Sequence, residues 1–244
     1  MRVLVLGGTA EARSLAALLH GSPDVEVITS LAGRVAAPKL PEGRTRIGGF
    51  GGPAALAAWL QAERITALVD ATHPFAERIT AAAVAASERT GVPLLMLRRP
   101  AWTAGPDDDW RHEPSMAAAA ANLPGERVFL TVGRTELGPF VADERRWFLI
   151  RSVDPPEPPI PPQALVVGAR GPFNIEGELG LMREHAIDVL VTKNSGGEMA
   201  AAKLAAARRL TVPVVMIDRP PVPAVTAVAT AQEAMSWIRL TRSR

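Results

Sequence analysis

The sequence contains no cysteine and no tyrosine, and its longest apolar runs are only as long as a β-strand. Without cysteine the chain can form no disulfide, thiolate metal site or cysteine nucleophile, so any redox chemistry would need a bound cofactor. A membrane helix needs about 20 consecutive apolar residues, so we expect no membrane span. Met1 leads directly into an apolar strand pattern without the segments of a secretory signal, and we therefore expect a cytoplasmic protein.

Lysine is also scarce, because only Lys39, Lys193 and Lys203 occur among the 27 basic residues. The isoelectric point of 9.6 could suggest a nucleic-acid partner, but the formal net charge is only +2. The basic residues are scattered rather than gathered in a stripe, so we expect no nucleic-acid binding. The histidines have no metal-ligand spacing, and we expect no metal site. The sequence also lacks the G-x-S-x-G motif of α/β-hydrolases.

The sequence does contain short runs rich in Val, Ile and Leu that alternate with alanine-rich amphipathic stretches. This alternation is typical of parallel strands that crossover helices bury on both faces. We therefore predict an α/β protein with two Rossmann-like domains and mainly parallel sheets. In the first half we expect strands at residues 3–6, 25–29, 44–47, 67–71 and 93–97, and helices at 10–19, 53–63 and 75–90.

The second half repeats the pattern. We expect strands at residues 127–131, 147–151, 165–168, 189–192 and 213–217, and helices at 115–122, 174–185, 197–209 and 230–239. Residues 98–114 have the composition of a loop, which predicts domains at residues 1–100 and 101–244 with a ligand cleft between them. Residues 154–162 hold six prolines and predict a stiff surface connection.

A glycine pair, Gly7 and Gly8, separates the first predicted strand from the first helix. Such a turn leaves backbone N–H groups at the helix N-terminus, where they can bind a phosphate. The predicted phosphate contacts are Gly8, Thr9, Ala10 and Glu11. The match to G-x-G-x-x-G is incomplete, and a plain strand-to-helix turn without a ligand is the alternative.

The second strand ends without the acidic residue that NAD enzymes use for the ribose 2′-hydroxyl. Ser30 and Arg34 stand there instead, and a hydroxyl with a guanidinium suits the 2′-phosphate of NADP. The alternative is that Arg34 is only a solvent-exposed side chain.

The fourth predicted strand, residues 67–71, carries Asp70 near its end and is followed by Thr72, His73 and Pro74. Ligands bind at the carboxyl ends of strands in open α/β sheets, so we predict that Thr72 and His73 contact the cofactor. Such residues often only satisfy backbone donors at a helix start, which is the alternative.

Two further strand ends in the second half combine glycine with arginine, at Arg134 and Arg170, and either arginine could hold an acidic group. We expect the two strands to be neighbours, which would bring these arginines together. Another strand ends in a polar turn with two glycines that could form a second anion cradle; its predicted contacts are Lys193, Asn194, Ser195 and Gly196. A solvated or structural turn is the alternative in each case.

Four of these segments, at residues 6–13, 70–76, 171–173 and 192–197, together resemble the precorrin-6A reductase family, also called CobK or CbiJ. The resemblance extends over nearly the whole chain. It implies NADPH-dependent reduction of one ring double bond of precorrin-6A to its dihydro product in cobalamin (vitamin B12) biosynthesis, without metal or flavin. It also implies that two Rossmann-like domains hold NADPH between them.

A flat tetrapyrrole fringed with carboxylates would need arginines and an apolar wall. The predicted substrate contacts are Arg134, Arg170, Gly171 and Phe173, and His73 is the candidate proton donor and catalytic residue. Two other interpretations of the glycine turns stay open. One is a non-catalytic NADP-binding sensor, and the other is a sugar-nucleotide or sugar-phosphate enzyme.

Overall fold

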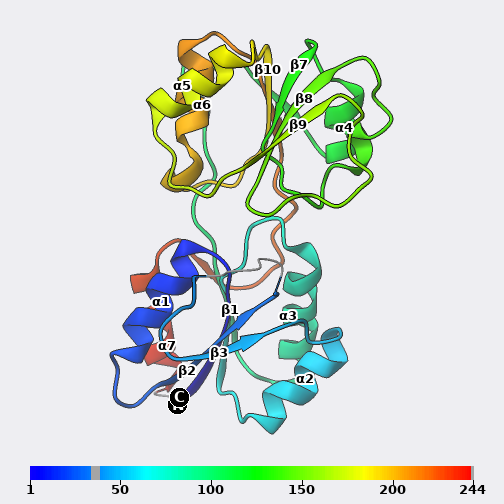
Figure 1. Cartoon of the computed structure of the whole chain (residues 1–244). Helices are drawn as coiled ribbons and strands as arrows, with labels where there is room; N and C mark the ends of the chain where they lie inside the picture. The colour runs from blue at the N-terminus through cyan, green and yellow to red at the C-terminus, as the bar shows by residue number, and fades with distance from the viewer. Residues whose placement is uncertain (34–38, 243–244) are drawn as a thin grey trace. The chain divides into compact units, whose positions relative to one another are not determined.

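The computed structural model describes residues 1–33 and 39–242 (Figure 1). The chain forms two compact units. The first unit combines residues 1–100 with residues 220–244, and the second unit comprises residues 101–219. Each unit contains a six-stranded sheet with helices on both faces, and the strand pairs are parallel. The predicted α/β class with two Rossmann-like sheets is confirmed.

The sheet of the first unit has the order β12-β5-β4-β1-β2-β3. Its strands are β1 (Arg2–Leu6), β2 (Glu26–Leu31), β3 (Arg44–Ile47), β4 (Ala67–Asp70), β5 (Leu94–Leu97) and β12 (Ala227–Val228). Its helices are α1 (Ala10–His20), α2 (Pro53–Ala62), α3 (Glu77–Thr90) and α7 (Ala231–Arg242). Helices α1 and α7 cover one face of the sheet, and α2 and α3 cover the other (Figure 1). The central strands are therefore apolar on both sides.

The second unit has the sheet order β6-β11-β10-β7-β8-β9. Its strands are β6 (Trp110–Glu113), β7 (Arg127–Leu130), β8 (Trp147–Ser152), β9 (Ala164–Gly168), β10 (Val189–Lys193) and β11 (Val214–Ile217). Its α-helices are α4 (Met116–Ala121), α5 (Ile175–Glu184) and α6 (Ala202–Arg209), and its short 3₁₀ helices are η1 (Gly138–Phe140) and η2 (Glu198–Ala200).

The predicted extent of the second domain, residues 101–244, was wrong at its C-terminal end. Residues 220–244 belong to the first unit, because β12 pairs with β5 and the apolar face of α7 packs on α1 and the sheet. A strand of two residues, Ala227 and Val228, is too short to leave a periodic pattern in the sequence.

The interpretation of residues 98–114 as loop was also wrong in part, because Trp110–Glu113 form the edge strand β6 beside β11. This strand is only half-buried, with a polar sequence, so it lacks the apolar run of a central strand. Within the described residues, each sheet consequently has six strands instead of the five expected. Helix α3 begins at Glu77 rather than at residue 75, and η2 precedes α6 where one longer helix was predicted.

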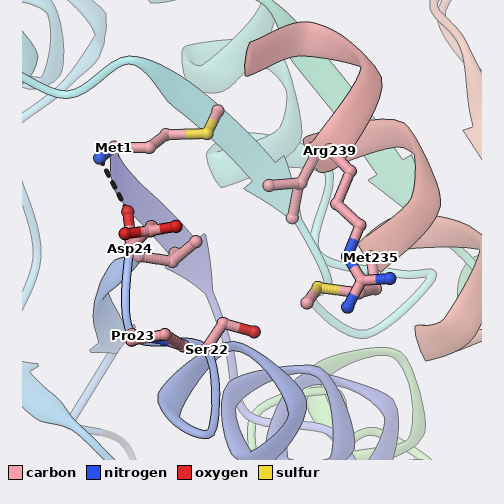
Figure 2. Close-up of a pocket in the computed structure, with 8 residues that line it drawn as sticks. Met1, Ser22, Pro23, Asp24, Met235 and Arg239 are labelled. Atoms are coloured by element: carbon pink, nitrogen blue, oxygen red, sulfur yellow. Dashed lines mark hydrogen bonds between the residues drawn. The ribbon is translucent and has the colours of Figure 1, made fainter. Parts of the chain in front are cut away.

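A cavity lies at the amino ends of β1 and β2, beside α7 (Figure 2). It is lined by Met1, Ser22, Pro23, Asp24, Val25, Met235, Ile238 and Arg239. The N-terminal amino group closes one side by donating to the Asp24 carbonyl at 2.9 Å. Because ligands bind at the carboxyl ends of strands in this fold, the cavity is at the wrong end of the sheet to be the expected site.

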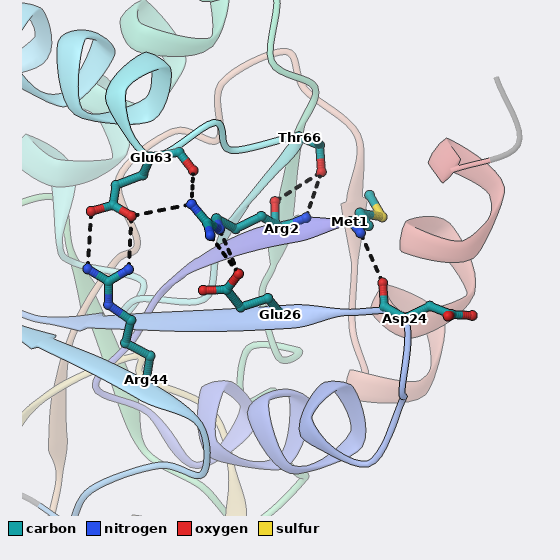
Figure 3. Close-up of polar contacts among 7 residues, drawn as sticks. All are labelled: Met1, Arg2, Asp24, Glu26, Arg44, Glu63 and Thr66. Carbon is teal, nitrogen blue, oxygen red and sulfur yellow. Dashed lines mark hydrogen bonds and ion pairs between the residues drawn. The ribbon is translucent and has the colours of Figure 1, made fainter.

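Ion pairs at the same end fasten the strands of the first unit (Figure 3). Arg2 donates to the Glu26 carboxylate at 2.8 Å and to the Glu63 carbonyl at 2.6 Å. Arg44 on β3 makes two hydrogen bonds to the Glu63 carboxylate, at 2.9 and 3.1 Å, and these lower the pKa of Glu63. The two arginines thus connect β1 and β3 to the end of α2.

Candidate functional site

The order of the first sheet reverses at β1, which pairs with β2 on one side and with β4 on the other. Read as β3-β2-β1-β4-β5-β12, it is the strand order of dinucleotide-binding folds, which bind ligands at this reversal. The carboxyl ends of β1 and β4 bring together the glycine turn at Gly7 and Gly8 and the segment from Ala71 to His73, both predicted from sequence.

Thr9 connects these two segments. Its hydroxyl accepts a hydrogen bond from the Ala12 amide at 3.1 Å, as an N-cap of α1, and donates to the Ala71 carbonyl at 2.8 Å. The side chain is buried. The Thr9 hydroxyl therefore holds the turn against the end of β4, and any ligand contact by Thr9 would come from its backbone.

The glycine turn fits a pyrophosphate. A Cβ at Gly7 would stand 2.8 Å from the Thr29 methyl group, so only glycine allows this close approach to β2. Gly8 has a φ of +116° and open space where a Cβ would be, which leaves the start of α1 accessible. An anion there would meet the amides of the first turn of an 11-residue helix.

Glu11 in the first turn of α1 forms an ion pair with Arg99 at 2.9 Å. Arg99 follows β5, so this pair also connects α1 to the carboxyl end of the sheet. The arginine places a positive charge beside the carboxylate at the same end of the helix. Of the predicted phosphate contacts, Glu11 therefore already has a charged partner, whereas Gly8 and Ala10 offer backbone amides.

Ser30, near the end of β2, is buried, and its hydroxyl accepts a hydrogen bond from Arg46 on β3 at 3.4 Å. The other residue predicted for the 2′-phosphate, Arg34, lies outside the described residues. The sequence interpretation missed Arg46, because only the pairing of β3 with β2 brings it beside Ser30.

The turn after β4 depends on the buried carboxylate of Asp70. One Asp70 oxygen accepts from the Thr72 amide at 3.0 Å and the Thr72 hydroxyl at 2.6 Å, and the other accepts from the Thr80 hydroxyl of α3 at 2.6 Å. Arg98 supports the same turn by donating to the Pro74 carbonyl at 2.9 Å. Asp70 and Thr72 are thus hydrogen-bonded to each other in the segment where the sequence predicted ligand contacts.

His73 follows directly and is half-buried. Its Nδ1 accepts a hydrogen bond from the Phe75 amide at 3.3 Å. That bond requires Nδ1 without a proton, so the neutral ring carries its proton on Nε2. The turn therefore determines which ring nitrogen of His73 can donate.

The second sheet reverses at β7, between β8 and β10. Lys193 at the end of β10 pairs with Glu136 from the segment after β7, at 3.2 Å. The Asn194 side chain accepts from the Trp102 amide at 2.8 Å and donates to the Trp102 carbonyl at 3.1 Å. Arg219 donates to the Asn194 carbonyl at 2.7 Å. Trp102 and Arg219 thus hold the turn of the predicted second cradle. Both residues are close in sequence to the points where the chain passes from one unit to the other.

The remaining residues of this turn are Ser195 and Gly196. The Ser195 carbonyl accepts from Arg219 at 3.0 Å, and Gly196 is buried with a φ of +67°. These contacts hold the turn at the end of β10.

Arg134 follows β7 and Arg170 follows β9, and β8 lies between these two strands. The expectation that they follow neighbouring strands was therefore wrong. Arg134 is half-buried, whereas Arg170 is exposed. The Arg151 guanidinium lies over the ring of Phe173, with its Cζ 3.8 Å from the ring centre. Gly171 lies close to the Met199 carbonyl, and a Cβ at this position would stand 3.0 Å from that oxygen.

A charged cluster that sequence reasoning missed is buried in the second unit. Arg151 on β8 pairs with Glu178 on α5 at 2.5 Å, and Lys203 on α6 donates to the Ala200 carbonyl at 2.9 Å. Burial, with a further contribution from the Arg151 charge, lowers the pKa of Lys203 to about 7. Lys203 stands out in the sequence only as one of the three lysines.

Within the residues that the structure describes, there is no group of three His, Cys, Asp or Glu side chains that could hold a metal ion. The same part of the chain has no helix long and apolar enough to cross a membrane.

Comparison with known proteins agrees with this architecture. The family described as precorrin-6x reductase CbiJ/CobK matches residues 2–239. The chain belongs to this family. It is 52% identical over 240 residues to the precorrin-6A reductase of Rhodococcus erythropolis, covering 97% of both chains. It is 48% identical over 240 residues to that of Rhodobacter capsulatus, covering 97% of this chain and 95% of the relative.

A solved structure described as CobK precorrin-6A reductase superimposes with a TM-score of 0.93 at 47% identity, covering 99% of this chain and 97% of that one. The family is one of oxidoreductases of cobalamin biosynthesis. These similarities favour neither the sensor nor the sugar-nucleotide interpretation.

Proposed function

We propose that this protein reduces precorrin-6A with NADPH, and that the first unit holds the cofactor. The supporting observation is the glycine turn at the reversal of the first sheet, with Thr9 joining α1 to the end of β4. A pyrophosphate at Gly8 and Ala10 would direct one half of the dinucleotide toward β2 and the other toward β4.

The second unit is the weaker candidate for the pyrophosphate. Strand β7 corresponds to β1 in the sheet order, but a 3₁₀ helix of three residues, Gly138–Phe140, follows it in place of an α-helix. Its turn therefore lacks the N-terminal helix dipole that α1 provides. Contacts of the cofactor with Lys193, Asn194, Ser195 and Gly196 stay a prediction.

When bound, NADPH supplies a hydride to a carbon of the ring double bond. The protein must then hold the reactants in register and provide a proton for the adjacent carbon. We assign the proton to Nε2 of His73, because the Phe75 amide occupies Nδ1. Asp70 and Arg98 hold the turn that carries His73.

For the substrate we propose contacts in the second unit. Arg134 and Arg170 end two strands of its sheet, and guanidinium groups bind carboxylates with two parallel hydrogen bonds. The ring of Phe173, with the neighbouring Gly171, offers an apolar surface on the same loop as Arg170.

The experiment is anaerobic incubation of the protein with NADPH and precorrin-6A, followed by absorbance of both compounds. His73→Ala should lower the turnover rate by roughly 10²–10⁴-fold with little loss of NADPH affinity, because general acid catalysis contributes that much. His20→Ala is the matched control, since His20 is an exposed histidine at the end of α1.

Stereospecifically deuterated NADPH tests the hydride step. We expect deuterium in the reduced ring, and its loss to solvent would exclude direct transfer. Binding of NADPH without oxidation in the presence of precorrin-6A would identify a sensor. Wild-type turnover of His73→Ala would leave water as the proton donor.

A further inference from the structure

Arg46 is a half-buried arginine that has no carboxylate within ion-pair distance among the described residues. Its Nη1 donates to the Gly48 carbonyl and, at 3.4 Å, to the Ser30 hydroxyl, and its Nη2 donates to the Gly49 carbonyl at 2.8 Å. Arg44, two residues earlier on the same strand, is instead fully paired with Glu63. The Arg46 charge is thus only partly compensated.

The Arg46 guanidinium also packs against aromatic rings. It lies over the Phe50 ring, 3.9 Å from the ring centre, and Phe50 packs edge-on against Trp59 of α2 at 5.4 Å. The two glycine carbonyls and the Ser30 hydroxyl use three of its five N–H groups. The N–H on Nε and one on Nη2, the pair that binds a planar or tetrahedral anion side-on, have no acceptor in the described part of the chain.

The position of Arg46 in the sheet indicates which anion these two N–H groups would bind. Ser30 and Arg46 face each other in the register of β2 and β3, at the carboxyl end of β2. In dinucleotide-binding folds this strand end meets the ribose of the adenosine, where an acid accepts the 2′-hydroxyl of NAD and an arginine accommodates the 2′-phosphate of NADP. Here β2 ends in Ser30 and Leu31, so no acid stands at the position.

We propose that Arg46, with Ser30 beside it, binds the 2′-phosphate and sets the preference of this protein for NADPH over NADH. The assignment rests on the proposed use of a nicotinamide dinucleotide in the first unit. The stacked guanidinium meets the phosphate in a geometry that is already formed, so little conformational entropy is lost on binding.

The test is calorimetric titration with 2′-phospho-ADP-ribose and with ADP-ribose, which differ only in the 2′-phosphate and carry no reactive nicotinamide. The wild-type protein should bind the phosphorylated compound roughly tenfold or more tightly. Arg46→Gln should remove that preference and leave the affinity for ADP-ribose unchanged. Arg46→Lys should keep part of the preference, because it keeps the charge but loses the fork.

Arg44→Gln is the matched control, because Arg44 lies on the same strand and pairs with Glu63 away from the ribose position. It should keep the wild-type preference. If Arg46 merely supports the turn at Gly48 and Gly49, Arg46→Gln would weaken the binding of both compounds equally, and that result overturns the assignment. An unchanged preference in Arg46→Gln overturns it as well. Failure of both compounds to bind the wild-type protein would instead refute the dinucleotide site itself.

Discussion

Asp70 shows how one buried carboxylate shapes the carboxyl end of the first sheet. The sequence places an acid at a strand end, where it could equally contact a ligand or satisfy local donors. In the structure both of its oxygens accept hydrogen bonds, from the amide and hydroxyl of Thr72 and from the hydroxyl of Thr80. Asp70 is therefore a positioning residue for the His73 turn.

Replacing Asp70 with asparagine tests that role. The amide nitrogen of Asp70→Asn cannot accept the hydrogen bonds that one carboxylate oxygen now accepts, so a buried donor loses its partner. We expect the free energy of unfolding to fall by about 1–3 kcal/mol. Turnover should also fall, because His73 loses its support, while KM for NADPH changes little.

Urea denaturation and steady-state kinetics measure the two effects. Asp109→Asn is the control, because Asp109 is an exposed acid in the second unit. A large rise in KM for NADPH with unchanged stability in Asp70→Asn would mean that the carboxylate contacts the cofactor directly.

At the scale of elements, α5 and α6 carry charges into the core of the second unit. Glu178 on α5 pairs with Arg151, and Lys203 on α6 lies 5.0 Å from the centre of the Trp102 ring. Burial lowers the pKa of Lys203 to about 7 in the folded state, whereas the unfolded chain keeps the ordinary value of 10.5. Between these two values the unfolded state binds more protons.

The stability of the second unit should therefore rise as the pH increases from 7 toward 10. Between pH 7 and pH 9 we expect a gain of about 2 kcal/mol in the free energy of unfolding. The sequence has no cysteine or tyrosine, so few other side chains titrate in this range. Urea denaturation followed by tryptophan fluorescence at pH 7, 8 and 9 measures the gain.

In Lys203→Met the pH dependence should disappear, because no buried amine remains to lose its proton. Lys39→Met serves as the control, since Lys39 is exposed, and it should behave like the wild type. A wild-type protein whose stability is constant from pH 7 to pH 9 would contradict the lowered pKa.

At the scale of the whole molecule, the chain leaves the first unit after residue 100 and returns to it at residue 220. The returning segment adds β12 beside β5 and contributes α7 to the core of the first unit, where Ala234 and Ile238 are almost completely buried. The first unit therefore depends on residues at the far end of the sequence.

Ile238→Ala tests this dependence. Truncating a buried isoleucine typically costs about 2–5 kcal/mol, and the loss should be confined to the unit whose core contains it. Hydrogen exchange should become faster in peptides from β1 and β4, while peptides from β7 and β10 keep their protection. Leu240→Ala is the control on the same helix, because Leu240 is 69% exposed. Equal loss of protection in both units would contradict the assignment of α7.

The sequence alone determined the α/β class, most of the strands and helices, the strand ends that carry the polar motifs, and the family. These features depend on local periodicity, on the glycines that mark turns after strands, and on the rule that parallel strands place their carboxyl ends at one edge. It did not determine the full roles of Asp70, Thr9 or Asn194, because each of these side chains also bonds a residue of another segment: Thr80, Ala71 and Trp102 respectively. Local periodicity does not indicate which segments lie together.

Only the tertiary structure decided which strands are neighbours. It placed β12 in the first sheet and β6 in the second, separated the strands of Arg134 and Arg170 by β8, and put Arg46 beside Ser30. The alternation of side chains along a strand indicates which face of the sheet each residue occupies. The neighbour of that residue on the next strand depends on pairing between distant segments. That pairing arises from burial of the whole sheet, which no local pattern of the sequence records.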